Sequence, residues 1–208
     1  MVEVDFPREI QGVISDLVFP PPAAYDADIA ALLSNEEAMT YLKAMSKTST
    51  GGWSIDDARI RREKQEEEYN LRSSLNCAIL WKGKFAGIGG FRDINWWNKC
   101  AEMGIILHPN YWKRRLSVEV HYLCLKFGFE VLGIHRVEFK TAASNIPMTR
   151  FLENILHASH EGTLRDFFPS GTEENCFENV AVYSVLSPEW PETKARLECK
   201  LQTSEITA

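Results

Sequence analysis

Residues 101–145 constrain the fold more than any other stretch of this 208-residue chain. An apolar run ends in a basic turn at 113–115, and Ser117 then opens a long amphipathic stretch. A second apolar run ends near Asn145. This order predicts a strand, a helix and a second strand, the crossover unit of α/β sheets. The free N–H groups at the helix start, next to the basic turn, would suit an anionic phosphate.

The rest of the chain predicts one mixed α/β domain, 1–208, with a core of about 13–190 and a polar C-terminal tail from Glu189. Ser54 and Asp57 have the spacing of a capping box at a helix start. The expected elements, in order, are a strand at 13–19, one or two short helices over 24–45, a helix from Ser54 to about Arg72, strands at 76–81, 85–91 and 100–107, a helix from Ser117 to about Leu132, a strand at 136–142, a helix at 145–156, and a final antiparallel pair at 162–168 and 179–186.

Composition excludes some classes of protein. Hydrophobic residues make up 45% and charged residues 25%, which are globular values. A net charge of −6 argues against a nucleic-acid partner, which usually meets a basic face. The five widely spaced cysteines predict reduced thiols, and the scattered histidines predict no metal site. With no apolar leader or membrane span in the sequence, we expect a cytoplasmic protein with no membrane partner.

Six strings, taken in their order, resemble the GNAT superfamily of acyl-CoA-dependent N-acyltransferases, and within it the RimJ/RimL-like branch. They are DADIAALLSNEEAMTYL, FAGIGGFRDI, AEMGIILHPNYW, FGFEVLGIHRVEFKTAASNIPMTRFLENI, LRDFF and AVYSVLSPEW, within about residues 13–190. The resemblance implies an α/β fold whose mixed, mostly antiparallel sheet is flanked by helices. It also implies that the fourth and fifth expected strands, 100–107 and 136–142, splay apart.

The resemblance implies acetyl-CoA as co-substrate, between the splayed strands, and no metal. The residues it places at this cofactor are Gly104, Ile105, Ile106, Leu107, Lys113, Arg114, Arg115, Leu116, Ser117, Val118, Asn145 and Arg150. Asn145 also suits a helix N-cap, and both roles can hold together. Arg150 could instead make a surface pair with Glu153 or Asn154.

The expected phosphate loop departs from the family pattern. That pattern is usually Q/R-x-x-G-x-G/A, whereas this chain has Arg115 at the glycine position and Ser117 at the last position. Glycine there lets the backbone approach a phosphate without a Cβ. Arg115 could pair with the phosphate or obstruct its cradle. A basic turn solvated at a strand–helix junction is the other interpretation.

Glu102 is the candidate general base, because amine acetylation needs a neutral amine and a route for its proton. The alternative is a partly buried glutamate that bonds to a neighbouring strand. Trp96 and Trp97 follow the strand at 85–91 and could line an acceptor site, or pack against the core or its rim. No side-chain acid for the thiolate is visible at 145–156, where Met148 takes the usual serine position, so Tyr183 or a water would serve.

The expected function is transfer of an acetyl group from acetyl-CoA to a primary amine by direct attack. A protein N-terminus, a polyamine, an aminoglycoside and a small biosynthetic amine all fit as acceptors. The chain would act as a monomer or a homodimer. The alternative is a catalytically degenerate member that binds acyl-CoA or a protein partner, for which Arg115 and Met148 are the motivation.

Overall fold

The computed structural model describes residues 5–45, 47, 51–170 and 176–202, and its centre is a single eight-stranded sheet. The strand order is β1-β2-β3-β4-β5-β6-β8-β7, and every neighbouring pair is antiparallel except β5 and β6. The strands are β1 Glu9–Gln11, β2 Ser15–Val18, β3 Leu75–Trp81, β4 Lys84–Asn95, β5 Cys100–Leu107, β6 Arg136–Ala142, β7 Ser159–Pro169 and β8 Phe177–Leu186. The predicted mixed, mostly antiparallel sheet is confirmed.

Local sequence explains the hairpin of β3 and β4. Lys82 and Gly83 both have positive φ, at 50° and 74°, as a two-residue turn of the type that matches strand twist requires. The register then pairs Leu75 with Phe91, and both side chains are buried in the core. The predicted hairpin is confirmed, and β4 runs to Asn95, four residues beyond the expected end at 91.

Five α-helices and five shorter helical segments flank the described sheet. They are η1 Ala23–Tyr25, α1 Asp26–Ser34, η2 Lys43–Met45, α2 Ile55–Asn70, η4 Pro109–Tyr111, α3 Leu116–Lys126, η5 Phe127–Val131, α4 Ile146–Phe151, η6 Leu152–Leu156 and α5 Trp190–Gln202. The capping box at α2 is confirmed, because Asp57 N donates to Ser54 Oγ at 3.1 Å and Ser54 N donates to Asp57 Oδ2 at 2.9 Å.

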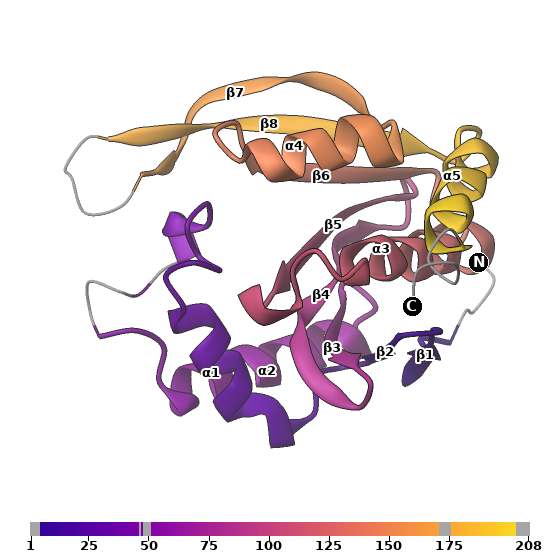
Figure 1. The fold of residues 1–208 in the computed structure, drawn as a ribbon. Helices are drawn as coiled ribbons and strands as arrows, with labels where there is room; N and C mark the ends of the chain where they lie inside the picture. The colour runs from indigo at the N-terminus through magenta and orange to yellow at the C-terminus, as the bar shows by residue number, and fades with distance from the viewer. Residues whose placement is uncertain (1–4, 46, 48–50, 171–175, 203–208) are drawn as a thin grey trace.

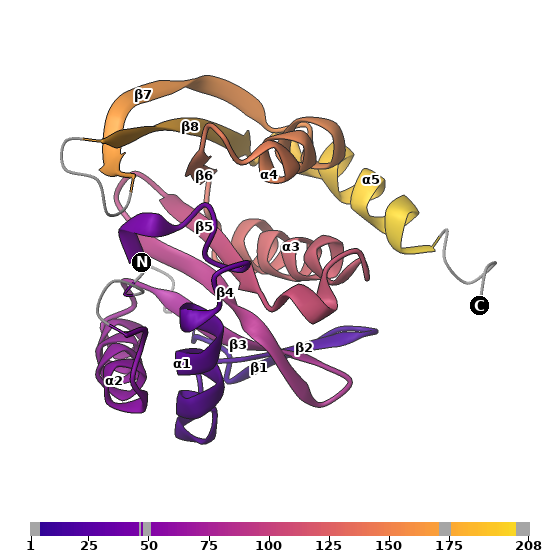
Figure 2. The same cartoon turned by 60° about the vertical axis from the view of Figure 1, so that its left-hand side comes forward.

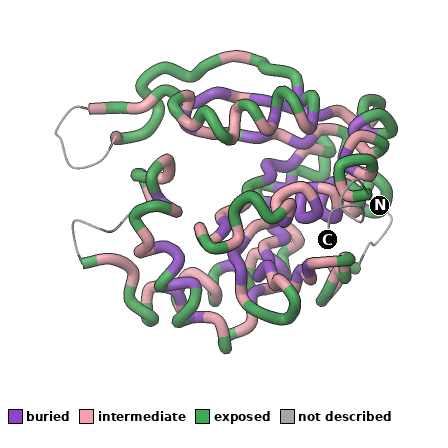
Figure 3. The backbone as a smooth tube through the Cα atoms, in the orientation of Figure 1, coloured by how far each residue is buried: buried purple, intermediate pink, exposed green. Residues whose placement is uncertain are grey.

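The helices cover both faces of the central strands. Figure 2 shows α1 and α2 on one side of β3, β4 and β5, and α3 on the other. Alternate residues of β5 therefore face different cores: Met103 packs in the cluster that includes α3, while Ile106 packs against the cluster built on α1 and α2. Figure 3 shows buried residues concentrated along the central strands and the inner sides of the helices.

The sheet opens between β5 and β6. These two strands pair only at Cys100 with Arg136, Ala101 with Val137 and Glu102 with Glu138. Beyond this point β5 continues along β4, whereas β6 pairs along its whole length with β8 (Figure 1). The predicted splay is confirmed, and it begins at Glu102. The expected fourth and fifth strands are β5 and β6 because β1 precedes the strand expected to be first.

Two expectations about the ends of the chain were wrong. Within the expected tail, Trp190–Gln202 form the helix α5, because Trp190, Thr193 and Leu197 make a buried stripe within a mostly charged sequence; the remaining residues, 203–208, lie outside the described part of the chain. Trp190 stacks on Phe129 with ring centroids 5.5 Å apart. The three-residue strand β1 was missed because it is too short for an alternating pattern.

Candidate functional site

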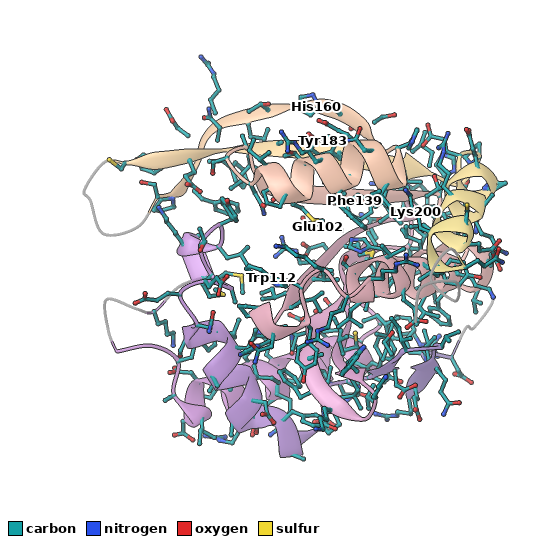
Figure 4. All side chains as sticks on the ribbon, in the orientation of Figure 1. Glu102, Trp112, Phe139, His160, Tyr183 and Lys200 are labelled. Carbon is teal, nitrogen blue, oxygen red and sulfur yellow. The ribbon has the colours of Figure 1, made fainter. Side chains whose placement is uncertain are left out.

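Glu102 lies where the sheet opens, and both of its carboxylate oxygens have cationic partners. Its side chain is buried, on the face of β5 that looks toward α1 and α2. Arg92, directly across on β4, donates from Nε to Oε1 at 3.0 Å. Lys140 on β6 donates from Nζ to Oε2 at 2.9 Å. Figure 4 shows Glu102 between the upper layer of β6, β8 and α4 and the lower layer of α1.

The same face of the sheet continues as a row of charges on β6. Arg136, Glu138 and Lys140 alternate along the strand, so their side chains share this face. Lys140 Nζ is 3.6 Å from Glu138, and Arg136 bonds both Glu138 and Glu161. The hydrogen bond to Glu102 raises the pKa of Lys140 despite its partial burial. The opening is therefore polar on this side.

Beyond Glu102, β5 leaves bare backbone at the opening. Gly104 is exposed, and a Cβ placed on it would meet nothing within 4 Å. Ile105 and Ile106 are half-buried, on opposite faces of the strand. The carbonyl of Leu107 accepts a hydrogen bond from the indole Nε1 of Trp112 at 3.0 Å. The strand edge from Gly104 to Ile106 is thus the part of β5 that could pair with an extended ligand.

The loop before α3 has the backbone conformation of an anion cradle. Lys113 and Arg115 both have positive φ, at 61° and 60°, although neither is a glycine. No side chain caps the start of α3, in contrast to the capping box of α2. The first-turn amides of Ser117 and Val118 have no carbonyl one turn earlier to accept from them. The helix start therefore offers N–H groups and the positive end of a helix dipole to an anion.

The arginine side chains of this loop turn to the protein. Arg114 Nε donates to the carbonyl of Asn110 at 2.9 Å, and its guanidinium lies over the ring of Trp81 at 5.2 Å. Arg115 Nη1 donates to the carbonyl of Lys200, near the end of α5, at 2.8 Å. In this arrangement the guanidinium of Arg115 is directed to the end of α5, and the backbone N–H groups at the start of α3 stay available.

Asn145 and Arg150 lie on α4, beside the open edge of β6. Asn145 is the N-cap of α4: its Oδ1 accepts from Met148 N at 3.2 Å, and its Nδ2 donates to Thr141 Oγ1 at 3.0 Å. Arg150 is exposed; Glu153 bonds Tyr183 instead of Arg150, and Asn154 Nδ2 donates to the backbone carbonyl of Arg150 at 3.0 Å. The capping role of Asn145 is thus present, and the contacts of both residues with a cofactor stay predictions.

Tyr183, a candidate acid, is held away from Glu102. It pairs with Phe139, whereas the next residue, Ser184, pairs with Glu138 on the face of Glu102. Burial and the neighbouring Glu153 raise the pKa of Tyr183 to about 12, and its hydroxyl donates to Glu153 Oε1 at 2.7 Å. Figure 4 shows Tyr183 in the layer above Glu102.

Trp96 and Trp97 lie in the turn between β4 and β5. The indole of Trp96 donates to the carbonyl of Arg72 at 2.8 Å and is tilted against Phe6. Trp97 is 93% exposed and lines a hollow of about 520 Å³ together with Phe129 and His135. The structure brings these indoles to the paired end of β5, whereas Gly104 lies on the open side of Glu102. Their contact with an acceptor stays a prediction.

Sequence reasoning missed three cations on the Glu102 face. Arg92 and Lys140 bond Glu102 directly, and burial together with the positive charge of Arg92 lowers the pKa of Arg61 on α2. Strand alternation could have placed Arg92 opposite Glu102, given the β4–β5 hairpin. Lys140 reaches Glu102 through the parallel pairing of β5 and β6, and the two residues are 38 positions apart in the sequence. No local sequence pattern predicts a contact over that separation. Among the described residues no group of His, Cys, Asp and Glu is arranged to hold a metal ion.

The family follows from comparison with known proteins. Residues 16–155 match the model of the acetyltransferase (GNAT) domain, so the chain belongs to the GNAT acetyltransferase family. Over 81 residues it is 35% identical to the uncharacterized N-acetyltransferase p20 of Bacillus licheniformis, covering 39% of this chain. Over 89 residues it is 28% identical to the uncharacterized N-acetyltransferase YnaD of Bacillus subtilis, covering 43% of this chain. The matches span about half of these relatives, 45% and 50% of their lengths.

Solved structures share the fold. A T. thermophilus protein described as an acetyltransferase superposes with a TM-score of 0.76 at 29% identity, over 94% of this chain and 98% of that one. The microcin C7 self-immunity acetyltransferase MccE, solved with acetyl-CoA and AMP, gives 0.72 at 19%, over 88% and 98%. Mycobacterium smegmatis RimJ, solved with CoA-disulfide, gives 0.74 at 14%, over 90% of each chain. Within the described residues no helix is long and apolar enough to cross a bilayer.

Proposed function

We propose that this chain transfers an acetyl group from acetyl-CoA to a primary amine by direct attack, as a member of the RimJ/RimL-like branch. The observation that carries the proposal is the end of β5–β6 pairing at Glu102. Past that residue, the free edge of β5 and the uncapped start of α3 belong to one continuous segment. An extended thioester ligand with a phosphate end has matching partners along this segment.

The residues fit acetyl-CoA in three places. The β5 edge at Ile105, Ile106 and the amide of Leu107 would pair with the amide-bearing arm. The backbone of the loop Lys113–Val118 would bind the pyrophosphate, with Leu116, Ser117 and Val118 at the positive end of α3. Asn145 and Arg150 would meet the arm and a phosphate from the α4 side. Acetyl-CoA supplies the acetyl group as an activated thioester.

The reaction balances with the groups at the opening. The neutral amine nitrogen forms a bond to the thioester carbonyl carbon, and the C–S bond breaks. Glu102 accepts the proton that the amine loses, directly or through a water, and β5 amides stabilise the charge on the carbonyl oxygen. The leaving thiolate then takes a proton from water, because the hydroxyl of Tyr183 is committed to Glu153.

The ion pairs of Glu102 set a condition on this mechanism. Its oxygens accept from Arg92 and Lys140, so uptake of a proton would neutralise the carboxylate and weaken its attraction to both cations. The same observation favours a second candidate function, a degenerate module that binds acyl-CoA without turnover. In that case the two cations would hold Glu102 as a structural link across the opening.

We also propose a cytoplasmic location, a monomer or homodimer, and an acceptor that is a small amine or a protein N-terminus. The wide spacing of the five cysteines in the sequence, with no C-x-x-C pair, fits a reducing compartment. Burial raises the pKa of the Cys124 thiol to about 12, which keeps it protonated and unreactive.

The release of free CoA thiol tests the proposal. The protein is mixed with acetyl-CoA and a panel of amines: polyamines, aminoglycosides, amino acids, amino-acid amides and peptides with free N-termini. Amine-dependent thiol release above the hydrolysis rate supports the transferase. Saturable acetyl-CoA binding without thiol release from any amine supports the binding module instead, and absence of both rejects the two candidates together.

A further inference from the structure

Two adjacent arginines on the inner side of α2 have different surroundings. Arg62 pairs with Asp26 of α1, with Nε to Oδ1 at 2.8 Å and Nη2 to Oδ2 at 3.2 Å. Arg61 forms no hydrogen bond and no ion pair with any described residue, and its Nε is buried. A buried guanidinium N–H without a partner costs free energy, so the unpartnered Nε of this half-buried side chain calls for an explanation.

Arg61 faces the sheet at the opening. It lies on α2 between Ala58 and Gln65, both buried. Burial and the nearby charge of Arg92 lower the pKa of Arg61, and Glu68 opposes this only in part. Arg92 belongs to the same face of β4 as Ile88, which packs in the α1–α2 cluster. Arg92, which bonds Glu102, and Arg61 therefore both belong to the side of the sheet that α1 and α2 cover, and their charges repel each other.

The counter-charges around this pair are already engaged. Glu102 accepts from Arg92 and Lys140, and Glu138 accepts from Arg136. The side chain of Arg92 is still 53% exposed, so it can accommodate a further anion. On the side of the opening toward α2, Arg61 therefore has no ion-pair partner among the described residues, and Arg92 is accessible to a ligand.

We propose that the acceptor carries an anionic group, a carboxylate or a phosphate, close to its amine, and that Arg61 and Arg92 bind this group. The inference rests on the proposed transferase function and specifies its acceptor as a small anionic amine. Guanidinium groups suit both anions because their N–H donors match two oxygens at once. With the anion on these two residues, the amine lies next to Glu102.

Binding of the anion would also act on Glu102. Arg92 would share its donors between the acceptor and Glu102, which would weaken one of the two ion pairs of Glu102. A neutral acceptor would leave Arg61 unpaired in a partly buried site. Sites of this kind reject analogues that lack the paired group more strongly than apolar pockets reject a missing methylene.

Matched acceptors test the inference with purified full-length protein. Free amino acids and phosphate monoesters of amino alcohols are compared with amino-acid amides and the parent amino alcohols, by CoA release from acetyl-CoA. We expect kcat/KM to be at least about tenfold higher for the acid or the phosphate than for its neutral partner. Whether the carboxylate or the phosphate series is preferred identifies the source of the anion.

Variants of α2 assign the preference to Arg61. Arg61→Gln should abolish the preference for the charged acceptor, while Arg61→Lys should retain only part of it, since lysine lacks the bidentate fork. Arg59→Gln is the matched control: Arg59 is on the same helix but pairs with Asp56 and Glu63 at the surface, so this variant should keep the wild-type preference. Because Arg61 makes no hydrogen bond, Arg61→Gln should fold with an unchanged or higher melting temperature.

The outcomes separate this inference from the function on which it rests. If neutral amines are acetylated as well as their charged partners, or if Arg61→Gln keeps the preference, the inference is overturned and the transferase stands. If no amine releases CoA, the transferase fails. Calorimetric titration with N-acetyl amino acids and their amides then decides the anion site: equal binding of both, or equal binding by wild type and Arg61→Gln, overturns it.

Discussion

At the scale of single residues, Glu102 combines burial with two cationic partners, Arg92 and Lys140. In its proposed role as a general base, Glu102 would contribute to the rate and little to cofactor affinity. We therefore expect Glu102→Gln to lower kcat by about 10²-fold or more, the usual contribution of a positioned base. Acetyl-CoA affinity, measured by calorimetry, should change little, because Glu102 precedes the free edge of β5.

The result for Glu102→Gln must be separated from loss of structure. Glutamine keeps the shape of glutamate but presents an amide to one of the two cations, so some stability is lost. Thermal denaturation of the variant measures that loss. An unchanged kcat in a folded variant would mean that Glu102 only links β4, β5 and β6.

His121 on α3 predicts how stability depends on pH. It is fully buried against Phe151, its Nδ1 contacts the carbonyl of Ser117 at 2.6 Å, and its Nε2 has no partner among the described residues. Burial lowers its pKa from 6.5 to about 4. Between these values the unfolded chain binds the proton and the folded chain does not, so stability falls as pH decreases through this window.

The predicted size of this effect is measurable. His121 should account for a loss of about 2 kcal/mol of unfolding free energy between pH 7 and pH 5. His121→Leu should lose correspondingly less stability over the same range. Urea unfolding of both proteins at the two pH values measures this difference, and parallel losses in wild type and variant would contradict the pKa assignment.

At the scale of elements, the loop and the start of α3 form a unit. Arg115 occupies the left-handed conformation that glycine adopts without strain, and its side chain bonds the Lys200 carbonyl of α5. We expect Arg115→Gly to bind acetyl-CoA as well as or better than wild type, because the backbone conformation suits glycine and the amides remain. Titration calorimetry checks this, and an affinity loss of about tenfold or more would show that the guanidinium itself contacts phosphate.

The edge of β5 makes a separate prediction. A Cβ at Gly104 would meet no described atom within 4 Å, so we expect Gly104→Leu to fold with nearly the wild-type melting temperature. Its side chain would enter the opening on the Glu102 side. We expect a raised acceptor KM or a lost kcat. Full activity in a folded variant would contradict the proposed position of the acceptor next to Glu102, on the face of β5 that Gly104 shares.

Elements with local signals were predicted, and those set by distant contacts were not. The turn at Lys82 and Gly83 and the capping box at Ser54 each depend on residues close together in the sequence, and both are present. Helix α5 was missed because its buried stripe is hidden in a polar composition. The partners of Glu102 come from two other strands, so the candidate base could be named from sequence but its environment could not.

At the scale of the whole molecule, a single parallel pair within an antiparallel sheet creates the opening. The opening begins where the three residue pairs between β5 and β6 end. The helices α1 and α2 cover one face of the strands beside it, and α3 covers the other (Figure 2). Glu119 of α3 ties the β1–β2 turn to the core through Val13 N at 2.8 Å and Ser15 Oγ at 2.5 Å. This contact holds the N-terminal strands to α3 beside the opening, while the backbone of β5 at the opening stays unpaired on its β6 side.

Titration calorimetry of wild-type protein with acetyl-CoA tests the central claim most directly, because it requires no knowledge of the acceptor. The opening between β5 and β6 predicts saturable one-to-one binding with a Kd below about 1 mM, the upper end of common KM values for enzyme substrates. Acetate alone, without the pantetheine arm and phosphates, should give no such heat. Absence of saturable acetyl-CoA binding in this range would contradict the assignment of the opening as a cofactor site.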